Sequence, residues 1–195
     1  AKRFIDFVRQ FGDSVLTAHA DLGWARDTRD SLLYPTSGSL QRLYGEVGLP
    51  GFDLEYYKVS YQHQYLQTFA KKYTLLLNGE VGYADGYGNK PLPFFKNFYA
   101  GGIGSVRGYR TSSLGPRDEY NNAVGGTSRI VGTAELMFPF PGLSTDKSVR
   151  LGVFVDGGMV FGKDEQIDVG EMRYAGGLAL SWYSPIGPLK FSLAR

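Results

Sequence analysis

The segment from Gly101 to Tyr109 contains the residues whose types and spacing most directly suggest a chemical role. Several glycines surround a single arginine, Arg107. A glycine-rich loop beside a cation can hold a phosphate, but a P-loop requires Gly-Lys-Ser/Thr at the start of a helix. Here Gly108 is followed by Tyr-Arg-Thr-Ser-Ser. The nucleotide interpretation therefore fails, and what remains is a glycine-bent loop that presents one guanidinium.

The other residues capable of chemistry give little support to catalysis, metal binding or nucleic-acid binding. His19 and His63 are the only histidines, His63 lies in an aromatic stretch, and His19 has no serine at a motif spacing. The 21 basic and 19 acidic residues are interspersed, whereas nucleic-acid binding requires a concentrated basic patch. We therefore predict that the chain is not an enzyme and that it uses no metal and no cofactor and binds no nucleic acid.

The composition indicates one all-β domain. The chain has 195 residues, with 27 glycines, 14 tyrosines, 13 phenylalanines and no cysteine. After about residue 12 no window has a sustained helical apolar period, and no apolar run approaches the roughly 18 residues of a membrane-spanning helix. Strands of a membrane β-barrel alternate in polarity and average to low hydropathy, so the composition allows such a barrel.

Alternation of apolar and polar residues predicts about eight strands. Successive side chains of a strand point to opposite faces, so each stretch has one apolar face and one polar face. The expected strands cover 16–24, 42–49, 57–65, 73–83, 129–138, 149–160, 172–183 and a last one from 189. Short turns alternate with longer polar connections, as in an outer-membrane barrel. The longest connection, about 85–127, carries Arg107 and greatly exceeds ordinary loop lengths.

The direction of the apolar faces decides between a membrane barrel and a soluble one. A soluble sandwich or lipocalin-like barrel also alternates, with its apolar face inward. Tyr73 and Tyr83 stand at the two ends of one apolar stripe, as expected where an outward band meets two membrane–water interfaces. Glycines on the polar face, such as Gly82 and Gly158, leave room inside. Both features favour a transmembrane barrel with its polar face toward the lumen.

That choice of faces places several charged side chains in the lumen. Glu135 lies between outward Ala134 and Leu136, and Asp156 lies between two outward residues in the same way. A guanidinium can span two carboxylates with fixed donors, so Arg107 is their natural partner if the long loop folds inward. We therefore predict a contact of Arg107 with Glu135 and Asp156. The alternative is that these charges only line a solvated pore, together with Asp21, Glu46, Glu80 and Arg150.

Several motifs resemble one known family. Val106-Arg107-Gly108-Tyr109 resembles the Val-Arg-Gly-Phe/Tyr loop motif of the BamA-like outer-membrane assembly family, within the bacterial surface antigen superfamily. The segment Phe98-Tyr99-Ala100-Gly101-Gly102, the strand around Phe154-Val155-Asp156 and the segment Ser184-Pro185-Ile186-Gly187-Pro188 add to this similarity. In that family the loop arginine docks against acidic residues of the following strands, which implies a lock formed by Val106, Arg107, Gly108 and Tyr109 against Glu135 and Asp156.

The resemblance also implies a function and a place in the cell. It implies a factor of the bacterial outer membrane that folds and inserts other β-barrel proteins without ATP. The implied partners are outer-membrane lipid and lipopolysaccharide, unfolded outer-membrane protein substrates, and accessory lipoproteins of the assembly complex. The implied mechanism is strand pairing at a barrel seam, where an added strand satisfies backbone groups that lipid cannot.

The sequence departs from the family pattern in length. The family barrel has sixteen strands preceded by periplasmic repeat domains, whereas this chain has about eight strands, no such domains, and begins without an apolar leader. We therefore expect residues 1–195 to be an internal part of the barrel, roughly its eighth to fifteenth strands. Two alternatives stay open: a two-partner secretion pore of the same superfamily, and a small self-contained barrel that binds a ligand.

Overall fold

The fold is a single antiparallel β-sheet that curves around one long loop. The computed structural model describes residues 2–70, 72–142, 148–163, 165, 168–184 and 186–195. Its elements are α1 (Lys2–Phe11), β1 (His19–Asp27), β2 (Gly38–Gly48), β3 (Tyr56–Phe69), β4 (Tyr73–Gly86), the 3-10 helix η1 (Phe94–Lys96), β5 (Ser128–Pro139), β6 (Val149–Phe161), the 3-10 helix η2 (Val169–Glu171), β7 (Arg173–Ser184) and β8 (Gly187–Ala194). This all-β architecture with eight strands confirms the fold class predicted from the alternation.

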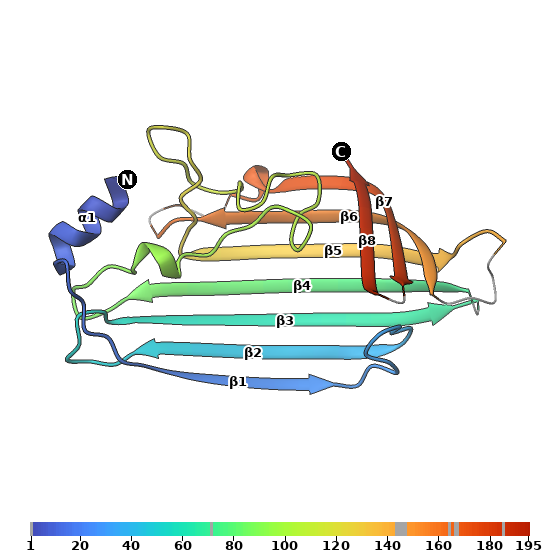
Figure 1. The fold of residues 1–195 in the computed structure, drawn as a ribbon, viewed down its shortest axis with the longest axis horizontal. Coiled ribbons are helices and arrows are strands. Elements are labelled where there is room, and N and C mark those ends of the chain that lie inside the picture. The colour runs from blue at the N-terminus through green and yellow to red at the C-terminus, as the bar shows by residue number, and fades with distance from the viewer. Residues whose placement is uncertain (1, 71, 143–147, 164, 166–167, 185) are drawn as a thin grey trace.

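The strands follow one another in space in the order of the sequence (Figure 1). Each strand pairs antiparallel with the next, from His19 opposite Gly48 at one edge to Gly177 opposite Ala194 at the other. No pairing between β1 and β8 is found among the described residues. The sheet is therefore open, with β1 and β8 as its edges.

The two faces of the sheet differ as the alternation predicts. Along β6, Val153 and Val155 are exposed on the convex face, whereas Phe154 and Asp156 are buried on the concave face. On the convex face the rings of Tyr57 and Tyr83 lie 6.0 Å apart at one end of the strands. Apolar residues thus point away from the body of the molecule, as in a membrane barrel.

The first strand begins later than the sequence pattern indicates. The alternation covers Leu16 to Trp24, but the paired strand runs from His19 to Asp27. Leu16 instead donates its backbone N–H to the Asp53 carboxylate at 2.7 Å. Pairing with β2 decides this boundary, because the ladder begins with His19 opposite Gly48, the last residue of β2. Alternation alone does not distinguish a paired residue from an extended one just outside the ladder.

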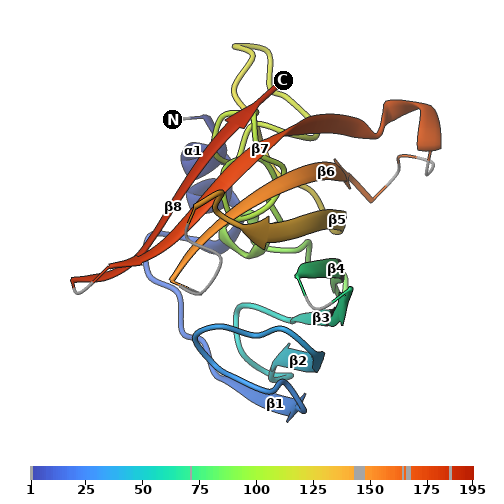
Figure 2. The same cartoon turned by 90° about the vertical axis from the view of Figure 1, so that its right-hand side faces the viewer.

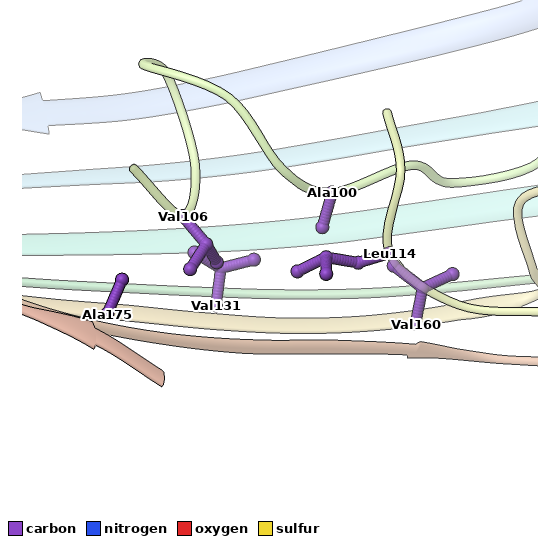
Figure 3. Close-up of a cluster of buried hydrophobic side chains, with 6 residues drawn as sticks. All are labelled: Ala100, Val106, Leu114, Val131, Val160 and Ala175. Atoms are coloured by element: carbon purple, nitrogen blue, oxygen red, sulfur yellow. The ribbon is translucent and has the colours of Figure 1, made fainter. Parts of the chain in front are cut away.

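The long connection between β4 and β5 lies on the concave face of the sheet (Figure 2). It contains η1 and three backbone bridges that tie its own parts together: Phe98 with Gly126, Ala100 with Leu114, and Arg117 with Ala123. Its apolar side chains pack on the sheet in a small cluster (Figure 3), made of Ala100, Val106, Leu114, Val131, Val160 and Ala175. The loop therefore occupies the space enclosed by the curved sheet, and this hydrophobic cluster lies between the loop and strands β5–β7.

The glycines of the concave face receive loop side chains. A Cβ atom built on Gly82 would lie 2.6 Å from the ring of Phe98, and one built on Gly158 would lie 2.6 Å from Val106. Both distances are shorter than side chains tolerate. The room predicted at these glycines is therefore occupied by the loop and does not form an open channel at these two positions.

The described residues include no helix that is long and apolar enough to cross a membrane.

Candidate functional site: the arginine of the long loop

Arg107 lies on the concave face of the sheet and contacts two carboxylates from neighbouring strands. Its Nη1 donates to Glu135 Oε2 at 2.7 Å, its Nε to Asp156 Oδ2 at 2.7 Å and its Nη2 to Asp156 Oδ1 at 2.8 Å. The backbone N–H of Arg107 adds a fourth hydrogen bond to Asp156 Oδ2, at 3.0 Å. One guanidinium therefore joins the loop to β5 and β6 at once, with a bidentate contact to Asp156.

The three charged groups are largely removed from water. The side chains of Arg107 and Glu135 are 11% and 12% exposed, and that of Asp156 is fully buried. Burial alone would lower the pKa of Arg107, but its hydrogen bonds to Asp156 and Glu135 outweigh this and raise the pKa above its ordinary value. Arg107 therefore stays charged at any physiological pH. Charge-assisted bonds of this kind are stronger than neutral ones where water is scarce.

An aromatic ring completes the surroundings of Arg107. The guanidinium carbon lies 3.3 Å from the centroid of the Phe154 ring, an arrangement that favours a cation. Phe154 comes two residues before Asp156 on β6, so both side chains point to the concave face. The sequence predicts no role for Phe154 beyond its place in the family-like motif. The signal available was an aromatic residue in the inward phase of a strand whose other inward residues are arginine, glycine, aspartate and valine.

The neighbours of Arg107 fix the backbone of the loop. Val106 is fully buried in the cluster against β5–β7, where Gly158 leaves the space for its methyl groups. Gly108 has φ +86°, a conformation that favours glycine, and a Cβ there would lie 3.1 Å from Ala194 Cβ. Tyr109 donates its hydroxyl to the carbonyl of Tyr174 at 3.2 Å. Each residue of Val106–Tyr109 thus makes a different contact that holds this part of the loop on the sheet.

A second group of contacts holds the beginning of the loop, about ten residues earlier. Lys96 of η1 forms an ion pair with Glu46 of β2, which also accepts the hydroxyl of Tyr56. Lys58 Nζ donates to the carbonyl of Lys96 at 2.8 Å and lies 4.2 Å from the centroid of the Phe98 ring. We call Lys96, Glu46, Tyr56, Lys58 and Phe98 the loop stem. The alternation of the sequence places Glu46 on this face but does not identify Lys96 as its partner.

The remaining predicted inward charges do not join Arg107. Glu80 pairs with Arg129, whose Nη1 also donates to the carbonyl of Tyr99 at 3.0 Å. Asp21 lies opposite Glu46 and is exposed. Arg150 donates to the backbone carbonyls of Pro35 and Tyr34. The concave face thus holds several separate polar contacts, of which one contains Arg107, Glu135 and Asp156.

Comparison with known proteins gives a consistent result. Residues 9–195 match the model of the Omp85 superfamily domain. The chain is 38% identical to the outer membrane protein assembly factor BamA of Neisseria meningitidis serogroup B, over 99% of this chain and 29% of that protein. It is 31% identical to a SAM50-like protein of Schizosaccharomyces pombe, over 75% of this chain and 32% of that protein. The chain thus spans less than a third of the length of these relatives.

A solved structure shares the fold. The crystal structure of BamA from Haemophilus ducreyi lacking POTRA domains 1-3 superposes with a TM-score of 0.85 at 29% identity, covering 100% of this chain and 44% of that one. The resemblance stated from the sequence motifs is therefore confirmed. With its open eight-stranded sheet, its outward apolar face and these relatives, the chain belongs to the Omp85 superfamily and is a protein chain of the bacterial outer membrane.

Proposed function

We propose that this chain forms part of the barrel of an outer-membrane protein assembly factor, in which Arg107 locks the long loop to Glu135 and Asp156. Membership of the superfamily and the names of the relatives support the activity. The observation that carries the lock is the set of four hydrogen bonds from Arg107 to two carboxylates of adjacent strands. The lock holds the loop in the one position that brings β5, β6 and β7 into contact with it.

The substrates of such a factor are other outer-membrane β-barrel proteins, which it folds and inserts without ATP. Strand pairing provides the physical means, because unpaired backbone groups in lipid are costly and an added strand satisfies them. The proposed partners are unfolded outer-membrane proteins, membrane lipid with lipopolysaccharide, and accessory lipoproteins. We further propose that this chain has no enzymatic activity, since the relatives it matches are named as assembly factors.

Residues 1–195 are proposed to be an internal part of a larger barrel, roughly its eighth to fifteenth strands. The open sheet with two unpaired edges favours this over a barrel closed at eight strands. Immunoblotting of outer-membrane fractions, with and without heating, tests it. We expect a heat-modifiable band several times larger than the 21.5 kDa of this chain. A heat-modifiable band at 21.5 kDa itself would instead identify a small self-contained barrel.

The lock is tested by replacing Arg107 in the native protein that contains this chain. Cells that depend on the variant are assayed for growth and for the folded, heat-modifiable fraction of a major porin. Arg107→Ala is expected to lower both, and Arg107→Lys to retain part, because lysine cannot form the bidentate contact with Asp156. Arg110→Ala is the matched control, since Arg110 is an exposed arginine three positions away in the same loop.

Two outcomes would contradict the proposal. Normal growth and normal porin folding with Arg107→Ala would remove the role of the lock. Loss of export of one secreted polypeptide, with porin folding intact, would identify a two-partner secretion pore instead of an assembly factor.

A further inference from the structure

The connection between β1 and β2, residues 28–37, folds back over the concave face at the end of the sheet opposite the long loop. Figure 1 shows it at the right-hand end, where the strands β1, β3 and β5 finish. We call residues 28–37 the inner turn. The inner turn is fixed to β3, the strand next to β2, by a hydrogen bond in which the Thr68 hydroxyl donates to the carbonyl of Thr36 at 2.8 Å. Arg29 Nη1 adds a hydrogen bond of 3.4 Å to Gln64 of the same strand.

The inner turn has a defined conformation of its own. The Asp30 carboxylate accepts the backbone N–H groups of Thr36 at 2.8 Å and Ser37 at 3.1 Å, as well as the Thr36 hydroxyl. The hydroxyl of Ser31 accepts the backbone N–H of Tyr34 at 3.1 Å. These hydrogen bonds give the inner turn a fixed internal conformation. Its position relative to the sheet is then set by a few contacts with the strands.

Its far contacts reach strands more than a hundred residues away in sequence. Arg150 of β6 donates to the carbonyl of Pro35 at 3.1 Å and to that of Tyr34 at 3.4 Å. The ring of Tyr34 lies 4.3 Å from that of Tyr183 on β7, centroid to centroid. The guanidinium of Arg150 also lies 6.0 Å from the Tyr34 ring. The inner turn therefore spans the concave face from β3 to β6 and β7.

A polar cavity of about 340 Å³ separates the inner turn from the tip of the long loop. Its walls include Leu32 and Pro35 of the inner turn on one side, and Ile103 and Arg107 of the loop on the other. Thr133 of β5 lines the cavity between them. The interior of the sheet is thus covered twice, by two segments that enter from opposite ends.

We propose that the inner turn is a second closure of the barrel interior, on the periplasmic side, and that Arg150 is the residue that positions it. The proposal rests on the outer-membrane barrel proposed above; in such barrels short turns face the periplasm and long loops face outward, and the inner turn lies at the same end of the sheet as the short turn between β3 and β4. It does not depend on the Arg107 lock, because none of its contacts involves Arg107. Arg150 suits this task, since a planar guanidinium can donate to two adjacent backbone carbonyls at once.

The closure is tested by the reactivity of a cysteine placed in the cavity. Residues 1–195 contain no cysteine, so Thr133→Cys supplies a single reporter once any cysteine elsewhere in the native protein is replaced by serine. The reporter is placed in the otherwise native protein, reconstituted in lipid vesicles, and a bulky charged maleimide is added from the side of the inner turn. Leu33→Cys, at a residue of the inner turn that is 59% exposed and does not line the cavity, gives the rate for free access.

We expect the Thr133→Cys reporter to react at least about tenfold more slowly than Leu33→Cys, and Arg150→Ala to raise its rate toward that reference. Tyr34→Ala is expected to act in the same direction, since it removes the contact with Tyr183. The matched control is Arg42→Ala, which removes an exposed arginine of the concave face whose side chain forms no hydrogen bond with the described residues. It should leave the rate unchanged.

Two results would overturn the closure. Fast reaction of the reporter with Arg150 present would mean that the inner turn does not cover the cavity. An unchanged slow rate in both Arg150→Ala and Tyr34→Ala, with the heat-modifiable fold retained, would mean that these residues do not position it. Because the readout is a thiol reaction and not growth, failure of the assembly function would leave this result interpretable.

Discussion

Arg107 and Arg150 both connect the concave face to a distant segment, but they differ in what they bind. Arg107 belongs to the loop and donates to two carboxylates of the sheet, one of them fully buried. Arg150 belongs to the sheet and donates to two backbone carbonyls of the inner turn. In the first contact a positive guanidinium binds negatively charged carboxylates. In the second a guanidinium binds neutral carbonyl groups.

This difference predicts different consequences of losing each arginine. Removing Arg107 leaves two carboxylates in a dry site without a counter-charge, which is costly. Removing Arg150 leaves carbonyl groups near the mouth of the barrel, where water can replace the donor. The loop contact should therefore determine stability, and the inner-turn contact should determine access to the interior.

The largest expected effect separates the two arginines by stability. Arg107→Ala should lower the free energy of unfolding by about 3–5 kcal/mol, the range for breaking a buried ion pair. Arg150→Ala should lower it by about 1–2 kcal/mol, since only hydrogen bonds to neutral groups are lost. Urea unfolding in lipid vesicles, followed by the heat-dependent shift in electrophoretic mobility, measures both. Equal losses would show that the two contacts are of the same kind.

A substitution at Gly158 tests whether packing holds the loop as firmly as charge does. A side chain at Gly158 overlaps Val106, so Gly158→Val should displace the loop while Arg107, Glu135 and Asp156 remain unchanged. Overpacking of this kind costs about 1–3 kcal/mol. Limited proteolysis of the loop and urea unfolding report it. Gly79→Ala is the control, because a Cβ at Gly79 meets nothing within 4 Å; an equal loss there would point to a general effect on the sheet.

Alkaline pH should distinguish the loop stem from the Arg107 contact. Burial lowers the pKa of Lys96, but its hydrogen bonds to Glu46 and Tyr56 outweigh this and raise the pKa above its ordinary 10.5. A raised folded-state pKa contributes stability below the unfolded value, and that contribution is lost as pH rises from 10.5 through the folded value. Hydrogen exchange at residues 94–99 should therefore rise first, while residues around Arg107 stay protected. Simultaneous loss of protection at both would contradict independent anchoring.

The smallest expected effect concerns the inner turn in acid. The hydrogen bond from the Thr36 hydroxyl, with the backbone N–H groups of Thr36 and Ser37, lowers the pKa of Asp30 to about 2. A depressed pKa contributes stability above the unfolded value of 3.8, and that contribution is lost as pH falls from 3.8 toward 2. Asp30→Asn should remove this dependence in hydrogen exchange of residues 30–37. The effect is small because Asp30 is exposed to solvent and its interactions are screened.

Alternation of residue types was sufficient to predict the sheet and the faces of its strands. The same period puts Glu135 and Asp156 on one face, and the structure brings Arg107 within hydrogen-bond distance of both. That this contact acts as a lock stays a prediction. The alternation also predicted the convex apolar face, because a strand that is buried on one side must repeat every two residues.

Contacts between segments without a regular period could not be predicted. Arg150 and the inner turn are separated by 115 residues, and nothing in either segment specifies the other. The same is true of Lys96 and Glu46, whose pairing depends on where η1 lies over β2. Glycine positions gave a partial signal: Gly82 and Gly158 indicated space, but not which side chain enters it.

The first half of the long loop is fixed at two different strands, Lys96 at β2 and Arg107 at β6. Because the sheet is curved, the segment between Lys96 and Arg107 crosses its concave side from β2 to β6, as a chord crosses an arc. A sheet bends most easily about an axis parallel to its strands, and a chord of constant length sets the radius of such a bend. We therefore expect the ten residues between the two anchors to limit the cross-section of this part of the barrel, so that inserting residues between positions 97 and 106 widens the barrel without changing a single strand.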